Sequence, residues 1–185
     1  MRRDDRDLPP ELTLVTAFVN TLDVEDTTDQ LASPPAFGAW IARAGLPNAG
    51  RASAAVTRRD LAAAIEMRDA LRRLLQAHSG NALRPDELPV LNQTFARYRA
   101  GIEFGLDADP IVQPRGTGTE ALLARILVDV ATAAALGHWE RCKLCPAEDC
   151  LWAFYDHSKN RSRRWCSMDL CGNRTKSKTF RQRHR

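Results

Sequence analysis

The sequence has no apolar run long enough to span a membrane as a helix. The longest candidate, ILVDVATAAALG, is short and contains Asp129, whereas a spanning helix needs about 20 predominantly apolar residues. The N-terminal stretch MRRDDRDLPP is highly charged and lacks the apolar centre of a secretory signal. These absences argue against a membrane-embedded or secreted protein, and we expect a cytoplasmic protein with no membrane partner.

Recognisable catalytic motifs are also absent. The sequence contains no phosphate-binding glycine loop and no arrangement typical of a nucleophile with its base. We therefore expect a protein that is not an enzyme, although its 4 histidines and 23 acidic residues could in principle act as acids or bases.

Cysteine is scarce, with five residues in a chain of 185. An odd number does not suit a disulfide framework, and disulfides are rare in the reducing interior of a cell. Four of the five cysteines stand in two matched loops, CPAEDC and CSMDLC, with four residues inside each loop. Regularly spaced cysteines in an intracellular protein indicate a metal site more often than a disulfide.

Zn²⁺ prefers four ligands in a tetrahedron, and the spacing allows two ways to supply them. The two matched loops together give C-x4-C-x15-C-x4-C. The alternative uses CKLC, in which Cys142 and Cys145 have the commonest zinc-knuckle spacing, and His157 is a further candidate ligand. Four thiolates would leave no open position for water, so either set predicts a structural metal and not zinc hydrolase chemistry.

Charge is unevenly distributed along the chain. Residues 141–185 contain 12 Lys and Arg against 4 Asp and Glu, whereas residues 1–140 contain 15 against 19. A basic tail on a mildly acidic body indicates a polyanionic partner, most commonly a nucleic acid. The composition changes near residues 139–142, where we expect a domain boundary.

The body, residues 1–140, is predicted to be mostly helical. The clearest helix lies over residues 57–80, with Thr57 as N-cap, Asp60 completing a capping box and Gly80 ending it. Residues 13–22, TLVTAFVNTL, suit either a strand or a buried helix. Other elements are expected as helices after Pro34–Pro35 through Leu46, over residues 85–98 and from residue 117 for roughly twenty residues, and as two strands around the turn DADP in residues 99–116. The fold class is therefore α+β.

The tail, residues 141–185, is predicted to be a small zinc-binding β-hairpin–helix module. Residues 152–155 read as one strand and residues 163–165 as its return strand. The segment after Cys171 reads as a helix, with Phe180 able to pack on the hairpin. On that helix four basic residues form one stripe suited to double-stranded DNA: Arg174, Lys178, Arg181 and Arg185. Arg174, near the start of the helix, is the expected base reader unless it braces the zinc loops.

Arg68 is the unusual residue of the body, because it lies at the centre of the apolar face of the helix over residues 57–80. An unpaired buried guanidinium is costly, so Arg68 should meet either an internal carboxylate or a bound anion. The second alternative predicts a ligand pocket, with Asn20 as a polar neighbour.

The tail closely resembles the CGNR zinc-finger family over about residues 143–183. The resemblance rests on RRWCSMDLCGNRTK, preceded by CLWAFYDHSKNRS, and the family name corresponds here to residues 171–174. It implies a C-x4-C pair in each half and makes Cys142 a spare cysteine. The implied ligands of one structural Zn²⁺ are Cys145, Cys150, Cys166 and Cys171.

The body is similar to the ABATE domain, a family described as a stress-induced transcription regulator. The shared pieces are FVNT at residues 18–21, MRDALRRLL around Arg68 and LN at residues 91–92; Ala17 stands where an acidic residue is common. The resemblance implies a bacterial regulator that binds DNA through its finger and senses a small-molecule effector, and such regulators usually form homodimers. The competing hypothesis is a zinc module that binds RNA or protein, with a purely structural body.

Overall fold

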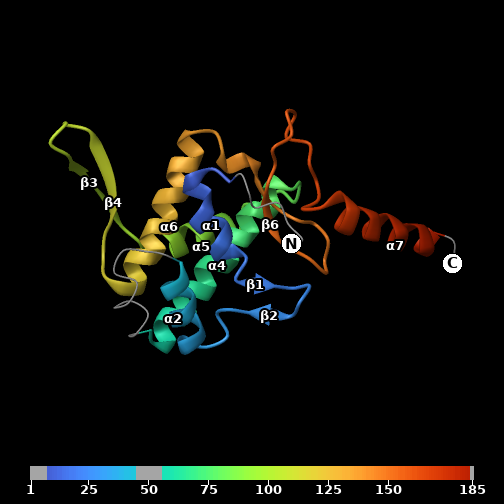
Figure 1. Ribbon diagram of the computed structural model, residues 1–185, viewed down its shortest axis with the longest axis horizontal. Coiled ribbons are helices and arrows are strands. Elements are labelled where there is room, and N and C mark those ends of the chain that lie inside the picture. Colours follow the sequence, from blue (N-terminus) through green and yellow to red (C-terminus); the bar gives the residue numbers. More distant parts are fainter. Residues whose placement is uncertain (1–7, 45–55, 184–185) are drawn as a thin grey trace.

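The computed structural model describes residues 8–44 and 56–183 of the chain. A helical body forms the centre, a two-stranded hairpin projects from one end and a helix projects from the opposite end (Figure 1). The helices are α1 (Pro10–Val19), α2 (Pro34–Arg43), α4 (Arg58–His78), α5 (Leu88–Phe95), α6 (Gly118–Ala135) and α7 (Asn173–Arg183), with short turns η1 (Trp139–Arg141) and η2 (Met168–Gly172). The strands form three antiparallel pairs: β1 (Leu22–Asp23) with β2 (Thr28–Asp29), β3 (Ala100–Phe104) with β4 (Pro110–Pro114), and β5 (Cys142–Leu144) with β6 (Ala153–Tyr155). The α+β prediction is confirmed.

The segment TLVTAFVNTL, which suits a strand or a helix, is helical up to Val19. The buried side chains Leu12, Val15, Phe18 and Val19 recur every three or four positions, so a helix directs all of them into the core. Burial of this face outweighs the modest helix propensity of the β-branched residues.

Helix α4 has the N-terminal capping box that the sequence predicts. Thr57 Oγ1 accepts the Asp60 N–H at 3.2 Å, and Asp60 Oδ2 accepts the Thr57 N–H at 2.9 Å. The other carboxylate oxygen of Asp60 accepts the hydroxyl of Thr119 at 2.6 Å, which fixes the start of α6 against the start of α4. Gly80, with φ of 101°, follows the helix and adopts a backbone conformation that glycine tolerates without strain.

Helix α2 begins at Pro34, as predicted, because its first two positions need no N–H partner and suit proline. Ser33 Oγ accepts the N–H of Ala36 at 3.3 Å and so caps the helix. The helix ends at Arg43; Leu46, predicted to belong to it, lies outside the described residues.

One hydrophobic core joins the helices of the body to the β5–β6 hairpin. Trp40 belongs to this core, with its ring centroid 5.6 Å from that of Phe18. The core also includes the hairpin residues Cys142, Leu144, Ala153 and Tyr155. The predicted boundary near residues 139–142 thus falls within a continuous packed core.

The two strands predicted in residues 99–116 form the β3–β4 hairpin, which projects from the body beside α6 (Figure 1). Ala100 pairs with Pro114 at its base and Phe104 with Pro110 near its tip. Ala108, in the connecting turn, has φ of 64°. None of the helices described here combines the length and the apolar composition that crossing a membrane requires.

Candidate metal centre and the adjoining basic helix

The four cysteines of the two matched loops lie together in the structure. Their Sγ atoms are all within 4.8 Å of one another, and all four residues are buried. Cys166 Sγ lies 3.5 Å from Cys150 Sγ and 3.6 Å from Cys171 Sγ. Sulfurs arranged tetrahedrally at about 2.3 Å from Zn²⁺ are about 3.8 Å apart, whereas a disulfide holds them at about 2.05 Å. The cluster therefore has the dimensions of a zinc site, and it suits one structural Zn²⁺ as predicted.

The first cysteine loop connects β5 to β6. Cys145 follows β5 directly, and its N–H donates to the carbonyl of Trp152 at 2.8 Å, which extends the strand pairing by one step. Cys150 closes the loop through a hydrogen bond from its N–H to the carbonyl of Ala147 at 2.9 Å. The next residue, Leu151, has φ of 49°, and this left-handed conformation turns the chain into β6.

The second cysteine loop contains the η2 turn, which leads into α7. The N–H groups of Cys171 and Gly172 both donate to the carbonyl of Ser167 at 3.1 Å, and Ser167 Oγ accepts the N–H of Leu170 at 3.3 Å. A Cβ on Gly172 would lie 2.5 Å from Met168 Sδ and 3.2 Å from the Trp165 ring. Glycine therefore allows close packing here, because a larger residue would displace the Met168 side chain and press on the Trp165 ring beside the ligand Cys171.

Cys142 is excluded from the cluster by the geometry of its strand. Successive side chains of a strand point to opposite faces, so Cys142 and Leu144 face the core of the body, whereas Lys143 points to the other side. Cys142 is fully buried in that core, and the desolvation raises the pKa of its thiol to about 12. The C-x2-C spacing of Cys142 and Cys145 is thus coincidental.

The hairpin of the finger differs from the one predicted. Its strands are β5 and β6, paired from Cys142 with Tyr155 to Leu144 with Ala153, whereas residues 163–165 form no strand. The prediction of a return strand at 163–165 is therefore wrong. Sequence periodicity does not reveal β5, because a strand of three residues is too short for its alternation of apolar and polar positions to be distinguished from chance.

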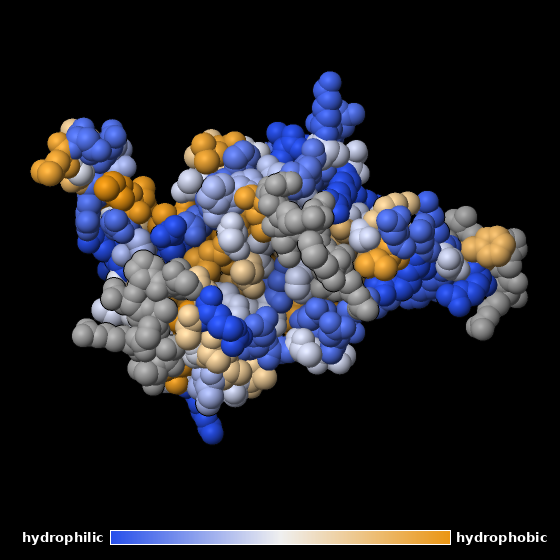
Figure 2. Space-filling model, in the orientation of Figure 1, coloured by the Kyte–Doolittle hydropathy of each residue, from blue (hydrophilic) through white to orange (hydrophobic). Residues whose placement is uncertain are grey.

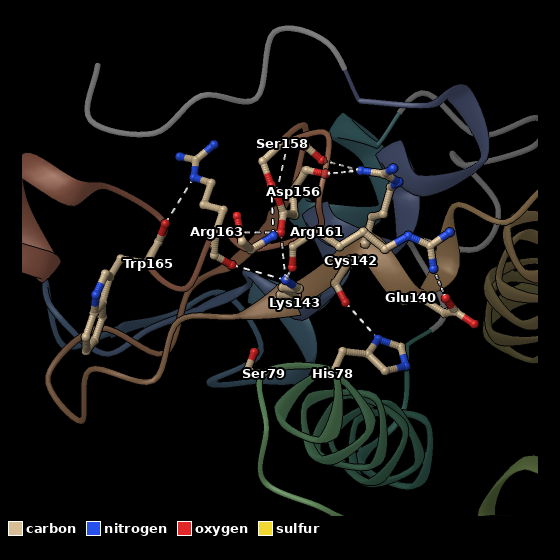
Figure 3. Close-up of polar contacts among 12 residues, drawn as sticks. His78, Ser79, Glu140, Cys142, Lys143, Asp156, Ser158, Arg161, Arg163 and Trp165 are labelled. Carbon is tan, nitrogen blue, oxygen red and sulfur yellow. Dashed lines mark hydrogen bonds and ion pairs between the residues drawn. The ribbon is translucent and has the colours of Figure 1, made fainter.

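Lys143 holds the segment after β6 by side-chain hydrogen bonds, where the sequence predicted strand pairing (Figure 3). Its ammonium donates to Asp156 Oδ2 at 2.6 Å and to the carbonyls of Arg161 and Arg163 at 2.6 and 3.1 Å. Asp156, fully buried, also accepts from both the N–H and the hydroxyl of Ser158. Burial alone would raise the pKa of Asp156, but the hydrogen bonds from Lys143 and Ser158 outweigh it and lower that pKa. Sequence reasoning missed this network because it counted Lys143 only as part of the basic tail.

The finger is attached to the body through side-chain hydrogen bonds to strand backbone. Asn20, at the end of α1, makes hydrogen bonds with both backbone groups of Ala153. Its Oδ1 accepts the N–H at 2.8 Å, and its Nδ2 donates to the carbonyl at 3.0 Å. Ser79, after α4, makes the corresponding pair with Leu144 at 3.1 and 2.6 Å. His78 Nδ1 lies 2.8 Å from the carbonyl of Cys142. These contacts hold the hairpin in one register against the helices.

Arg68 forms an internal ion pair, the first of the two alternatives that its burial predicts. Its guanidinium donates to both oxygens of Asp29 at 2.6 and 3.0 Å and to the hydroxyl of Thr21 at 3.2 Å. Burial of Asp29 would raise its pKa, but the hydrogen bonds from Arg68 and Leu31 and the nearby guanidinium charges lower it. With Asn20 bonded to Ala153, both side chains are engaged by partners within the protein, which supports a structural role for each.

The segment after Cys171 is helical, as predicted, and α7 extends away from the body (Figure 1). Arg174 at its start is half-buried and forms ion pairs with Glu25 at 3.0 Å and Asp149 at 3.1 Å, and its guanidinium lies 3.5 Å from Cys171 Sγ. In this structure Arg174 therefore braces the zinc loops against the body, the alternative to base reading.

The other basic residues of the stripe are more exposed. Lys178 forms an exposed ion pair with Glu148 at 3.2 Å, and Arg181 Nε donates to the carbonyl of Ser177 in its own helix at 3.3 Å. Arg185 lies outside the described residues. Phe180, expected to pack on the hairpin, is 64% exposed.

The aromatic side chains of the finger hairpin are buried in two different clusters, Tyr155 in the core of the body and Phe154 beside the cysteines. Phe154 and Tyr155 are 4% and 7% exposed, and Phe154 packs beside the cysteine cluster. His157 is exposed and contacts the Tyr155 ring, and it does not belong to the cluster of four cysteines.

These features define a helical protein with a four-cysteine zinc finger built onto its core. The family model of the CGNR zinc finger matches residues 141–184, and that of the ABATE family, whose description is "Putative stress-induced transcription regulator", matches residues 12–137. The chain belongs to the ABATE family and carries a C-terminal CGNR zinc finger. A comparison with curated proteins finds no match.

The geometry predicts that Cys150→Ser abolishes zinc binding, whereas Cys142→Ser retains it. The first change removes a thiolate from the cluster, and the second places a hydroxyl in the apolar core and costs stability only. Zinc per chain, measured by plasma mass spectrometry after exhaustive dialysis, should fall from one to near zero in the first variant alone. Loss of zinc in Cys142→Ser with retention in Cys150→Ser would show that the other ligand set is correct.

The contacts of Asn20 predict that replacing this residue by alanine destabilises the protein. Asn20→Ala leaves the buried N–H and carbonyl of Ala153 unpaired, and each such group costs about 1–3 kcal/mol. We expect the free energy of urea unfolding to fall by roughly 2–4 kcal/mol. Asn92→Ala, on the exposed side of α5, is the matched control and should change it by less than about 0.5 kcal/mol. Equal stability of the two variants would contradict this role of Asn20.

Proposed function

We propose that this protein regulates transcription by binding double-stranded DNA through its zinc finger, with α7 as the element that enters the groove. The observation that carries the proposal is the position of α7, a basic helix that starts two residues after Cys171 and projects beyond the body (Figure 1). Membership of a family described as a transcription regulator supports the same function.

The dimensions of α7 suit a DNA groove. Its 11 residues span about 16 Å at 1.5 Å per residue, and an α-helix fits the major groove of B-DNA. The surface of the helix seen in Figure 2 is mostly hydrophilic, with apolar colour near its outer end; the large apolar side chain exposed on α7 is Phe180. Its exposed cations include Lys176, Lys178 and Arg181. Lys176 lies outside the predicted stripe and adds a further positive charge.

The ion pair of Lys178 does not prevent phosphate binding. Lys178 is 60% exposed and Glu148 is 89% exposed, and exposed pairs contribute at most about 1 kcal/mol. Lys178 can therefore exchange Glu148 for a phosphate at little cost. Since Arg174 is engaged with Glu25 and Asp149, Arg181 is the better candidate to contact a base edge, because a guanidinium can donate two hydrogen bonds to guanine.

A second basic surface lies on the loop between Asp156 and Cys166. Lys159, Arg161 and Arg164 are exposed there, and the Lys143–Asp156 network fixes the loop that bears them. In the proposed complex these cations contact phosphates next to the groove that α7 occupies. Because the body is mildly acidic, phosphates repel it, and this favours an approach in which the basic tail, residues 141–185, meets the DNA first.

The competing function, binding of single-stranded RNA, is less well supported. Single-strand binding usually requires exposed aromatic rings on which bases stack. Phe154 and Tyr155 of the finger hairpin are buried, so that Phe180 on α7, 64% exposed, offers one such ring. The proposal includes no catalytic role, and it places the protein in the cytoplasm, where the thiolates of the finger stay reduced.

We also propose that the body senses a small molecule, at a site other than Arg68 and Asn20. A pocket of about 410 Å³ lies between α1, α2 and α6, a volume that suits a small ligand. Its apolar lining includes Leu14, Ala17 and Trp40, and its polar lining includes Arg43 and an Arg125–Asp129 ion pair. Arg43 donates to the neutral amide of Gln30 at 3.0 Å, so the pocket keeps a positive charge. It suits an aromatic carboxylate.

The proposed DNA complex predicts that Lys178→Ala and Arg181→Ala weaken binding to duplex DNA. Each lost phosphate contact should lower the slope of log affinity against log salt by about 0.9. If Arg181 reads a base, Arg181→Ala should also reduce discrimination at one base pair by about 1–3 kcal/mol.

Affinity should be measured by fluorescence anisotropy at several salt concentrations, on sites obtained by selection from random duplexes. Arg84→Ala, on an exposed part of the body, is the control and should leave affinity unchanged. Tight binding to single-stranded RNA without salt-dependent binding to duplex DNA would refute the proposal.

The sensing proposal predicts that benzoate binds in the pocket and that benzylamine does not. Ala17→Phe, which fills the pocket from its exposed wall, and Arg43→Gln, which removes its charge, should each abolish saturation transfer from protein to benzoate in NMR. Ala131→Phe, on the exposed side of α6 and outside the pocket lining, should preserve it. Unchanged transfer in Ala17→Phe would place benzoate elsewhere and contradict the proposed site.

A further inference from the structure

The β3–β4 hairpin exposes more large apolar side chains than a solvated hairpin needs. Ile102 is 63% exposed, Phe104 72% and Val112 49%, and Leu106 at the tip is fully exposed. Figure 2 shows orange apolar surface on this projecting arm, at the end of the molecule opposite α7. Apolar residues gathered on one projecting element indicate an interaction surface.

The strand register separates this hairpin into two different faces. Directly paired residues of an antiparallel sheet lie on the same face, so Ile102 shares a face with Val112, and Phe104 shares it with Pro110. Ala100 and Pro114 complete this face. All six residues are apolar, and we call this surface the apolar face of the hairpin.

The opposite face of the hairpin carries an ion pair. It carries Gly101, Glu103, Ile111 and Gln113. Arg115 donates to Glu103 Oε1 at 3.0 Å, and its guanidinium lies over Gly101, where a Cβ would collide with it. Ile111, 45% exposed, is the large apolar side chain of this face, and its other residues are polar, charged or glycine. The two faces therefore differ in chemistry within one short element.

An identical copy fits the apolar face better than a charged partner does. The face has no charged residue, so two copies related by a two-fold axis can pack face to face without like-charge repulsion. Together with the tip, each copy would contribute on the order of 500 Å² of apolar surface, and the total of about 1,000 Å² is the size of a weak but specific interface. Because the hairpin and α7 lie at opposite ends of the molecule (Figure 1), this packing leaves both α7 helices uncovered.

We propose that the protein forms a two-fold symmetric dimer through the apolar face of the β3–β4 hairpin. Ile102, Phe104 and Val112 of one copy pack against the same residues of the second copy. The dimer presents two fingers and suits the two-fold half-sites that transcription regulators commonly bind. The interface itself does not depend on DNA binding, and it is tested without DNA.

The test is sedimentation equilibrium of the zinc-loaded full chain from 1 to about 200 μM, the range in which an interface of this size associates. We expect the wild-type protein to form dimers. The double substitution Ile102→Thr with Phe104→Thr should raise the dimer dissociation constant by about 100-fold. Threonine keeps the preference for strand conformation, and circular dichroism and zinc content should remain those of the wild type.

Ile111→Thr is the matched control, because it makes the same kind of change on the opposite face of the same hairpin. It should leave the dissociation constant within about twofold of the wild-type value, less than one mutated interface contact usually costs. A wild-type protein that stays monomeric over the whole range would overturn the proposal, as would a dimer that persists in the double variant. Equal effects of the double variant and Ile111→Thr would also overturn it. Duplex DNA affinity per chain is measured separately, so a failure of the dimer does not count against DNA binding.

Discussion

The docking of one short β-hairpin into the helical body governs the arrangement of the whole molecule. β5 and β6 are too short to be stable alone, but Asn20 and Ser79 each bond both backbone groups of one strand residue, Ala153 and Leu144. These bonds fix which side of β5 faces the body. Since side chains alternate along a strand, Cys142 enters the body core, Lys143 points away from it, and Cys145 begins the zinc loop.

From this docking follow the zinc site and the direction of α7. The small finger gains stability from the metal that its limited apolar core cannot provide. Lys143 and Asp156 hold the segment between β6 and Cys166, which forms no strand, and Gly172 lets the η2 turn pack closely against Met168 and Trp165. Arg174 then ties the first turn of α7 to Glu25 of the body. Finger and body therefore form one structural unit with a shared core, although each matches its own family model.

The three candidate binding surfaces lie in different parts of the molecule. The basic helix α7 lies at one end and the β3–β4 hairpin at the other (Figure 1). The pocket lined by Trp40 and Arg43 belongs to the helical body. In the proposed regulator a ligand in the pocket would contact α1, whose last turn is bonded to β6 through Asn20. This is a short and continuous path from the pocket to the finger.

Features that depend on local spacing could be predicted from the amino-acid sequence alone: the capping box of α4, the proline start of α2, the β3–β4 hairpin, the helix after Cys171 and the presence of a four-cysteine zinc site. Periodicity and short motifs carry such information because the interacting residues are neighbours in the chain. The resemblance to the CGNR family, and not spacing, selected among the cysteines. The folded chain was needed to establish that Arg68 pairs with Asp29, that Asn20 bonds Ala153, that Cys142 belongs to the body core and that Arg174 braces the finger. Each of these depends on partners that lie far apart in the chain, and the spacing within one segment can indicate that a residue is buried but not which distant residue it meets.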